Sequence, residues 1–483
     1  MRWGYLLYIV GTLLVAIGLT MVWPLGFSLY YRDAGLLPLG GACLITVLSG
    51  LLLVAIFRRT DLQVPISHRE GMAITTFGWL AAGFFGALPF YFGGVFSHPM
   101  DCLFESISGF TTTGASVLTD IEAVPKGLLF WRSLTHWLGG MGIIVLSLAI
   151  LPFLGVGGMQ LYKAEVPGPV PDKLRPRIRD TAMILWQVYI LFSAAETVLL
   201  MLGGMDLFDA LCHTFGTMAT GGFSTKNASI GYYQSAYIDG VITVFMLIAG
   251  INFSLHYFVL KGKPAVLWRD PECRFFLGLF CIFTAITTIF IYGAQAPSWG
   301  RALQYAAFQL ASILTTTGYA TVNFELWPAL PQCLLLLCMF IGGCAGSTGG
   351  GMKCMRILLL LRLAYQELFR LIHPRAVTRL KLGDQVVSSE IISGIGGFFV
   401  LWLVLLFVGV FLVAATGVDV LTSFTAVLAS IGNIGPGLGS VGPAENYAHL
   451  PAFAKGVLAL CMLLGRLEIF TVIILFLPEF YRK

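Results

Sequence analysis

Ten apolar runs, each long enough to cross a lipid bilayer, constrain this chain more than any other feature. They lie near residues 5–31, 36–57, 71–96, 128–155, 181–205, 234–261, 273–294, 331–372, 389–416 and 451–478. Charged residues make up 11% of the chain, against about 25% in soluble domains. The sequence therefore predicts an all-α polytopic membrane protein with about ten transmembrane helices, and it excludes soluble enzymes and nucleic-acid binders.

Lysine and arginine are divided unequally between the two sides of the predicted bundle. The segments after the second, fourth, sixth and eighth runs, together with both termini, carry 22 of the 29 basic residues. The opposite segments carry 6, and Arg466 lies inside the last run. Because basic residues accumulate in cytoplasmic loops, both termini are expected on the cytoplasmic side.

A repeat of about 100 residues organises the chain after its first two runs. Four pairs of runs each enclose a stretch too short to cross a bilayer, at 101–115, 208–222, 305–319 and 422–436. Each stretch ends in a turn anchored by a glycine, at Gly114, Gly221, Gly318 and Gly435. These units predict two N-terminal membrane helices (1–60) and four pore repeats, at 61–180, 181–270, 271–385 and 386–483.

The four turns carry groups that suit a bare monovalent cation. Backbone carbonyls can replace its hydration shell, and glycine permits the positive φ that turns them inward. Pore-helix C-termini add a negative potential. One such turn would mean little, but four at matched positions predict a cation pore. The candidate potassium-binding filter residues are Thr112, Thr113, Gly114, Ala219, Thr220, Gly221, Thr316, Thr317, Gly318, Asn433, Ile434 and Gly435.

Several strings carry a more specific likeness. They are Ser-Gly-Phe-Thr-Thr-Thr-Gly-Ala (108–115), Gly-Gly-Met-Gly-Ile-Ile-Val-Leu (139–146), Leu-Pro-Phe-Leu-Gly-Val-Gly-Gly-Met-Gln-Leu-Tyr (151–162), Gly-Gly-Phe-Ser-Thr (221–225), Gly-Gly-Cys-Ala-Gly-Ser-Thr-Gly-Gly-Gly-Met-Lys (342–353) and Gly-Arg-Leu-Glu (465–468). With the four-repeat layout, they resemble the Trk/Ktr/HKT superfamily of potassium transporters. Within it, the chain is similar to the bacterial Trk pore-forming subunits of the TrkH/TrkG type over essentially its whole length.

The resemblance implies potassium uptake across the bacterial inner membrane through a homodimer with one pore per subunit, and no enzymatic activity. It also implies a cytoplasmic nucleotide-binding ring of the TrkA type as regulatory partner. Nucleotide is therefore expected on that partner, and no cofactor on this chain. In this superfamily, glycine at all four filter positions goes with potassium preference, and serine in the first repeat goes with sodium. The fourth turn departs from the Thr-Gly pattern at Asn433 and Ile434, so the ring is not fourfold equivalent.

A glycine-rich segment interrupts the eighth run at 342–353. It fails as a phosphate loop, because Met352 separates Gly351 from Lys353, and Cys354 follows in place of serine or threonine. It is either a glycine kink that permits close packing or, as the resemblance supports, a flexible gating loop below the filter. Arginine inside the last run needs a specific partner, which this loop could supply. The candidate gate residues are Gly346, Ser347, Thr348, Gly349, Gly350, Gly351, Lys353 and Arg466.

Two other functions stay open. A proton- or sodium-coupled potassium symporter is one. Five ionisable residues in or near apolar runs could carry protons, although each is better explained as a packing or interfacial residue: Glu105, His136, Glu196, His213 and His256. The other is a membrane enzyme, although the sequence has no metal cluster, nucleophile elbow or paired carboxylates.

Two basic cytoplasmic loops also have two interpretations. They run from Lys163 to Arg179 and from Arg370 to Lys381. Their charges either determine topology alone or also dock the regulatory ring.

Overall fold

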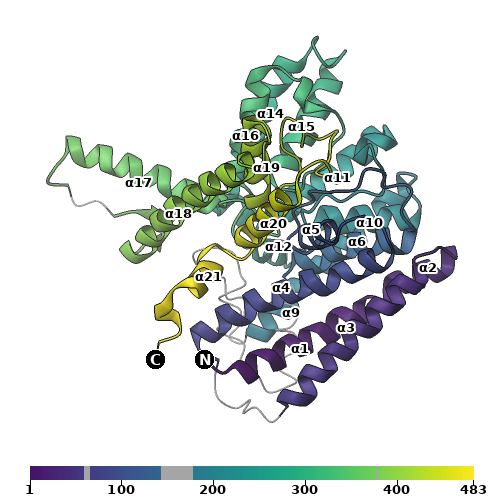
Figure 1. Cartoon of the computed structure of the whole chain (residues 1–483). Coiled ribbons are helices and arrows are strands. Elements are labelled where there is room, and N and C mark those ends of the chain that lie inside the picture. Colours follow the sequence, from purple (N-terminus) through teal and green to yellow (C-terminus); the bar gives the residue numbers. More distant parts are fainter. Residues whose placement is uncertain (59–65, 143–177, 377–378, 384, 483) are drawn as a thin grey trace.

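The computed structural model describes residues 1–58, 66–142, 178–376, 379–383 and 385–482. Within them the regular structure is helical, apart from one antiparallel hairpin of β1 (Lys381–Leu382) and β2 (Gln385–Val386) (Figure 1). The loop from Lys163 to Arg179 lies outside the described residues except at its last two positions, where a helix begins.

Three kinds of helix recur in the same order four times along the chain. A long first helix opens each repeat: α4 (His68–Phe92), α9 (Ile178–Leu202), α14 (Pro271–Ile291) and α18 (Ser389–Ala414). A short pore helix follows: α5 (Pro99–Phe110), α10 (Leu207–Met218), α15 (Trp299–Leu314) and α19 (Val420–Ile431). A second helix then runs back: α6 (Lys126–Gly140), α11 (Ala236–Gly250), α16 (Ala329–Ile341) and α20 (Ala452–Arg466).

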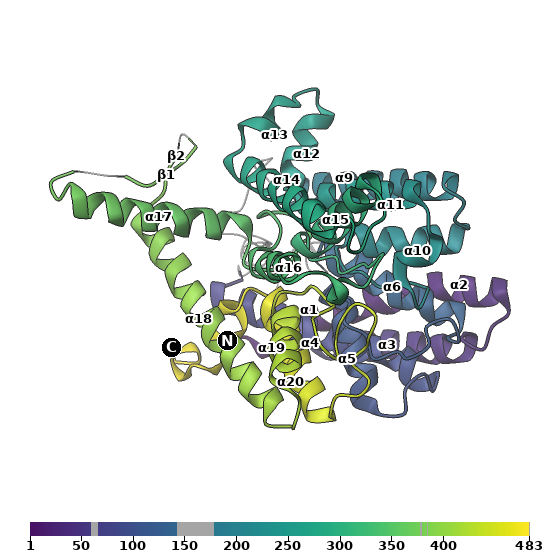
Figure 2. The same ribbon diagram turned by 90° about the horizontal axis from the view of Figure 1, so that it is seen from above.

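The four repeats are arranged in a ring. Within each repeat the pore helix packs against both longer helices. The second helix of each repeat also packs against the pore helix of the next one, in the pairs α6 with α10, α11 with α15 and α16 with α19. The pair α20 with α5 closes the circle between the fourth repeat and the first. Figure 2, seen from above, shows the repeats around one centre.

The N-terminal helices form a separate layer on the outside of the ring. They are α1 (Trp3–Thr20), α2 (Val22–Tyr31) and α3 (Leu36–Phe57), and α1 packs along α3. At their crossing, a Cβ atom on Gly50 would lie 2.7 Å from Gly11 O, and one on Gly11 would lie 2.9 Å from Gly50 O. Small residues let membrane helices approach this closely. Both helices also contact α4, which joins this layer to the first repeat.

Six helices of the described residues are long and apolar enough to cross a membrane, counting α1 with α2 as one. Two strongly bent pairs bring the possible number to eight: α11 with α12 (Phe253–Leu260), and α20 with α21 (Phe470–Ile473) and η4 (Ile474–Phe476). Of the two remaining predicted runs, 128–155 continues from α6 into residues outside the described part of the chain. The run 331–372 is divided at its glycines between α16 and α17 (Cys354–Ile372).

The pore helices begin at side chains that cap them. Asp206 and Asp419 accept hydrogen bonds from the third residue of α10 and α19, at 2.8 and 2.9 Å. Ser298 does the same for α15, and His98 caps α5 through its Nδ1 atom. A side-chain cap satisfies an N–H group that has no partner inside the helix. Short helices within a membrane protein are thereby given a defined start.

The remaining elements connect the repeats. The helix α13 (Ala265–Arg269) joins the second repeat to the third, and α17 extends away from the ring as an arm (Figure 2). Three short 3-10 helices complete the described chain: η2 (Ser229–Tyr233), η3 (Phe324–Leu326) and η5 (Pro478–Phe480).

Candidate functional site

All four pore helices end in the same hydrogen-bonded turn. In the first repeat, Thr112 N donates to Gly109 O at 3.0 Å, and Thr113 N donates to Ser108 O at 2.9 Å. This pair of bonds is the Schellman motif, which satisfies the last helix carbonyls and places a left-handed residue after the helix. The same two bonds close α10, α15 and α19, with distances of 2.7–3.2 Å.

A residue other than glycine takes the left-handed conformation in each of these turns. Values of φ between 51° and 61° occur at Thr112, Thr220, Thr316 and Asn433. Such a backbone costs about 1–3 kcal/mol, yet it recurs at the same step of all four turns. Two residues later the backbone is left-handed again, with φ of 79–101°, at Gly114, Gly222, Gly318 and Gly435.

In the second repeat the structure differs from the predicted register. Sequence matching placed Gly221 opposite Gly114, whereas the structure places Gly222 there. Gly221 lies one step earlier, and Ala219 is the C-cap of α10. The reason is that Thr220 is the left-handed residue after this helix, and the two glycines that follow it cannot be told apart by spacing alone. Gly221 still belongs to the turn.

The four turns contact one another in a closed ring. A Cβ atom built on Gly114 would lie 1.9 Å from the carbonyl oxygen of Gly221 in the next repeat. A Cβ atom built in the same way would lie 2.0 Å from Thr317 O on Gly222, 2.1 Å from Ile434 O on Gly318, and 2.7 Å from Thr113 O on Gly435. Each glycine therefore lies against a carbonyl of the following turn, and the fourth turn returns to the first.

The ring presents backbone oxygens where four helices end. A helix C-terminus carries a partial negative charge, and all four pore helices terminate here. The polar side chains of the turns themselves are neutral hydroxyl and amide groups, and Asn433 Nδ2 donates to Thr113 Oγ1 at 3.0 Å. Neutral oxygens in a ring are the ligands that potassium filters use. The arrangement therefore suits a monovalent cation.

The glycine-rich segment at 342–353 packs against the ends of three pore helices. It makes one hydrogen bond to each: Thr348 Oγ1 to Met218 O at 2.9 Å, Gly350 N to Thr316 Oγ1 at 2.6 Å, and Gly351 N to Gly432 O at 2.9 Å. A Cβ atom on Gly350 would lie 2.4 Å from Gly432 O, and one on Gly349 would lie 3.0 Å from Thr315 O. The structure thus brings the predicted gate residues into contact with the predicted filter turns.

The same segment completes a broken helix of the second repeat. The axes of α11 and α12 differ by 107°, so the helix carbonyls at the bend have lost their usual partners. Cys344 N donates to Gly250 O at 2.9 Å, and Phe253 N donates to Gly346 O at 3.0 Å. Ser347 Oγ donates to Cys344 O, so this hydrogen bond joins two residues of the segment itself. Backbone groups at the bend and in the segment therefore satisfy each other.

Arg466, the last residue of α20, ties this segment to the first repeat. Its Nη1 donates to Thr348 O at 2.8 Å, and its Nη2 donates to Gly139 O at 2.5 Å and to Gly140 O at 2.8 Å. The expected contact between Arg466 and the glycine-rich segment is present. With this residue included, the segment is linked to all four repeats.

Two more charged groups lie at the end of the segment. Lys353 has φ of 73° and its Nζ donates to Gly349 O. In the first turn of α17, Arg356 forms an ion pair with Glu468, which follows the end of α20. Beyond the bond from Gly351 to Gly432 O, the segment and the helix that follows it are thus also joined to the fourth repeat through Arg466 and through Arg356.

Glu272, in the first turn of α14, was not predicted as a site residue. Its Oε1 atom accepts hydrogen bonds from Ala345 N at 2.7 Å and from Met355 N at 2.9 Å. It therefore holds the glycine-rich segment near its start and the first turn of α17 just after its end. An acid at the start of a membrane helix looks like an ordinary interfacial residue in sequence, so no local signal marks this role.

We expect Glu272→Ala to lower the melting temperature of the detergent-purified protein. One buried and one partly buried N–H group would lose their acceptor, at a cost of about 1–3 kcal/mol for the buried one. Glu272→Gln is the matched control, because its amide oxygen can accept from the same two groups. A melting temperature equal to wild type for the alanine variant, measured by thermal unfolding, would show that the segment does not depend on this carboxylate.

Most of the buried ionisable residues singled out in sequence have hydrogen-bond partners. The three histidines lie 2.7–2.9 Å from an acceptor or hydroxyl, in the pairs His136 with Gly109 O, His213 with Ser224 Oγ and His256 with Ile248 O. Glu105 pairs with Arg132 at 2.6 Å. Glu196 differs, because neither of its carboxyl oxygens has a hydrogen-bond partner among the described residues. No group of three or more His, Cys, Asp or Glu side chains in the described residues could hold a metal ion.

Known proteins share this arrangement. The chain matches the TrkH family model, a cation transport protein, over residues 43–481. It is 43% identical over 479 residues to the Trk system potassium uptake protein TrkH of Escherichia coli K12, with 98% of each chain covered. Identity to TrkG of the same organism is 36%, over 98% of this chain and 97% of the relative. The crystal structure of the potassium transporter TrkH from Vibrio parahaemolyticus is 40% identical, covers 100% of both chains and has a TM-score of 0.90.

These matches span the repeats, the four turns and the glycine-rich segment together. They confirm the predicted fold, an all-helical multi-pass membrane protein with the TrkH architecture. They also confirm the resemblance noted in its sequence strings. The chain belongs to the TrkH family of cation transport proteins.

Proposed function

We propose that this chain forms a potassium-conducting pore and takes up potassium across a bacterial inner membrane. The observation that carries the proposal is the closed ring of four turns, in which each glycine lies against a carbonyl of the next repeat. Such a ring can replace the hydration shell of a monovalent cation with backbone oxygens. The names of the TrkH and TrkG relatives, all potassium uptake proteins, support potassium as the substrate.

The glycine-rich segment acts as the gate in this proposal. It lies across the ends of three pore helices, and Arg466 holds it to the fourth side of the ring. Three glycines with positive φ, at Gly342, Gly346 and Gly351, give the segment a backbone that side chains do not restrict. Opening would require the Arg466 hydrogen bonds to break and the segment to leave the ring.

Both termini face the cytoplasm in the proposed orientation. They lie close together (Figure 1), and Arg69 Nη1 donates to Arg482 O at 2.6 Å while Arg2 pairs with Glu70 at 2.8 Å. A shared side for the termini agrees with the uneven distribution of basic residues, of which 22 were assigned to that side.

A homodimer and a cytoplasmic regulatory ring of the TrkA type complete the proposal. The arm α17 extends from the ring and exposes large apolar side chains, with Leu371 and Ile372 at 77% and 72% exposure. Apolar surface on an extended arm is typical of a protein interface. Opening of the gate would follow nucleotide binding by the regulatory ring. The basic loop from Arg370 to Lys381 begins in the last turn of the arm and offers charges to that partner.

A second candidate, proton-coupled potassium transport, rests on Glu196. This carboxyl group is fully buried in α9, without a hydrogen-bond partner in the described structure. Ionisable residues in such places often mark proton relays in transporters. If coupling occurs, Glu196→Gln should abolish the response of potassium flux to a proton gradient and leave the response to voltage intact.

Reconstitution into liposomes tests the proposed function. Rubidium, potassium and sodium uptake would be measured with the purified chain alone and with its nucleotide-loaded partner, with and without a protonophore. We expect potassium and rubidium to enter well ahead of sodium and without need of a proton gradient. Absence of flux with the partner present would contradict the pore. Flux that stops when the proton gradient is removed would favour the coupled transporter.

A further inference from the structure

One position in the pore helices differs chemically among the four repeats. Five residues before the last residue of each pore helix stand Glu105, His213, Gln309 and Ala426. In the first three repeats this side chain bonds to the irregular segment that leaves the filter turn, which we call the outgoing strand although it belongs to no β-sheet. His213 Nε2 lies 2.9 Å from Ser224 Oγ, and Gln309 Nε2 lies 3.2 Å from Thr321 Oγ1. In the first repeat the residue is charged and makes two such bonds.

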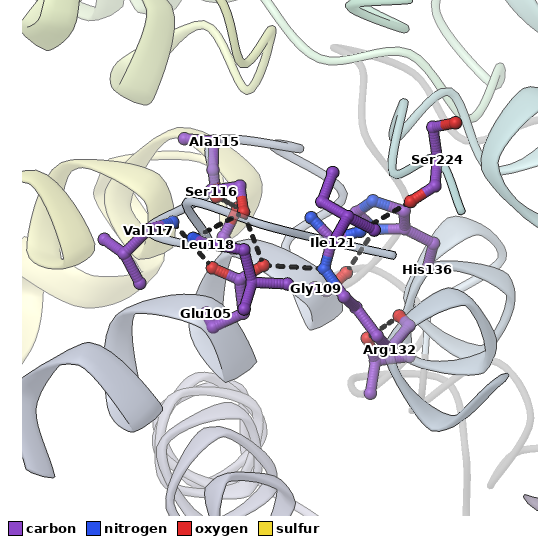
Figure 3. Close-up of polar contacts among 12 residues, drawn as sticks. Glu105, Gly109, Ala115, Ser116, Val117, Leu118, Ile121, Arg132, His136 and Ser224 are labelled. Atoms are coloured by element: carbon purple, nitrogen blue, oxygen red, sulfur yellow. Dashed lines mark hydrogen bonds and ion pairs between the residues drawn. The ribbon is translucent and has the colours of Figure 1, made fainter. Parts of the chain in front are cut away.

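Glu105 holds the outgoing strand of the first turn against its own pore helix. Its Oε2 atom accepts from Val117 N at 2.9 Å, and its Oε1 atom accepts from Ser116 Oγ at 2.9 Å. These residues follow Gly114 by two and three positions. Figure 3 shows the carboxylate between the strand and Arg132. The side chain is completely buried, so its charge is compensated inside the protein.

Arg132, from α6, carries this connection into the second repeat. Its Nε donates to Glu105 Oε1 at 2.6 Å, and its Nη1 donates to Ser224 O at 3.0 Å (Figure 3). The guanidinium carbon also lies 3.6 Å from the centre of the Phe223 ring. Phe223 and Ser224 directly follow the filter glycine of the second turn. The pair of Glu105 and Arg132 therefore links the outgoing strands of two adjacent filter turns, with Glu105 bonded to the first and Arg132 to the second.

His136, one helical turn after Arg132, supports the same second strand. Its ring stacks on Phe223 with the ring centres 4.0 Å apart, and its Nδ1 atom lies 2.7 Å from Gly109 O (Figure 3). A Cβ atom on Gly221 would lie 2.5 Å from the imidazole ring. The helix α6 of the first repeat therefore contacts both the second turn and its outgoing strand.

An ion pair at this place is poorly explained as a contribution to stability. Burying two charges costs several kcal/mol each, and an apolar pair of similar size is often as stable. The pair instead fixes the relative orientation of the groups that it joins, because the planar guanidinium donates its hydrogen bonds in fixed directions. Selection between potassium and sodium depends on the spacing and number of coordinating carbonyls. A directional contact between two filter strands fixes that spacing.

We propose that Glu105 and Arg132 are positioning residues for ion selectivity. The pair sets the distance between the first and second filter turns from behind, without contacting the ion. The proposal rests on the potassium pore proposed above. It predicts that weakening the pair changes the ratio of potassium to sodium flux, whereas a purely structural pair would change only the amount or stability of folded protein.

The test compares Glu105→Gln and Arg132→Lys with wild type in liposomes. The lysine variant keeps the positive charge but lacks the planar guanidinium, which donates to Glu105 and to Ser224 from two separate nitrogen atoms. We expect the potassium-to-sodium flux ratio to fall by about twofold or more. A twofold change corresponds to the smallest interaction energies found between residues in contact. Glu105→Gln combined with Arg132→Lys should lower the ratio by less than the product of the two single effects. Flux is normalised to folded protein, and melting temperatures are recorded beside it.

Two further variants separate positioning from general damage. Ser116→Ala removes one hydrogen bond to Glu105 and leaves both charges in place, so it tests the role even if the charge variants fold poorly. We expect a smaller fall of the ratio in the same direction. Glu70→Gln weakens the ion pair with Arg2 at the start of α4, away from the filter turns. It should lower the melting temperature and leave the ratio unchanged.

The outcomes distinguish this role from the pore itself. A wild-type protein that passes sodium as well as potassium would refute the proposed function and this role with it. A selective wild type, with Arg132→Lys and Ser116→Ala equally selective, would refute the role alone. An equal fall of the ratio in Glu70→Gln would also refute it, because the effect would then not be specific to the filter strands.

Discussion

Gly222→Ala is expected to lower potassium flux in liposomes at least about tenfold, the change that 1.4 kcal/mol produces. A left-handed backbone at a residue with a Cβ atom costs about 1–2 kcal/mol, and φ at this position is 79°. In addition, the new Cβ atom would lie 2.0 Å from Thr317 O. That carbonyl belongs to the filter turn of the third repeat, so it cannot yield without moving a second quarter of the ring.

Gly293→Ala is the matched control for this substitution. Gly293 has φ of 76°, and no atom lies within 4 Å of an added Cβ. It therefore carries the same backbone cost without the collision, and its flux should stay close to wild type. Rubidium, potassium and sodium uptake per folded protein provide the measurement. Equal losses in both variants would mean that backbone strain, and not the ring contact, accounts for the effect.

Arg466→Ala is expected to raise potassium flux in the absence of the regulatory partner. The guanidinium donates to Thr348 O, Gly139 O and Gly140 O, and so holds the glycine-rich segment against the ring. Hydrogen bonds to charged groups contribute about 1.5–3 kcal/mol each. Loss of one such contribution from the closed state alone would raise the open fraction about tenfold.

Arg466→Lys gives a graded comparison. An ammonium group retains the charge but lacks the planar fork that reaches carbonyls on two sides, so we expect flux between that of wild type and the alanine variant. Melting temperatures show whether each variant is folded. Basal flux of a folded alanine variant that equals wild type, or falls below it, would contradict the closing role of Arg466.

The sequence predicts the fold well because membrane insertion leaves few alternatives. The lengths of the apolar runs alone separate spanning helices from the short pore helices. The division of the run 331–372 followed from its glycines, and α16 and α17 flank that break. The bends in the second helices of repeats two and four were not predicted. There the break falls at Asn252, which caps α12, and at Glu468 with φ of 54°, within runs that remain apolar overall.

The filter register shows where sequence spacing stops being informative. Four glycines could be matched by eye, but the second turn contains two in succession, and only the Schellman bonds of Thr220 and Gly221 distinguish them. Two contacts between distant parts of the chain were also beyond prediction. Glu272 and the segment it holds are more than seventy residues apart, and Arg132 meets Ser224 at a separation of 92 residues. Such pairs depend on how the helices are arranged, which no local pattern encodes.

The four filter turns belong to one polypeptide, and this has a genetic consequence. In a channel built from four identical subunits, one codon change alters every quarter of the filter at once. Here one codon alters a single quarter, and the other three continue to shape the site. The differences among Glu105, His213, Gln309 and Ala426 show that the quarters have already diverged. Ion preference in this architecture can therefore be adjusted in small steps, one quarter at a time.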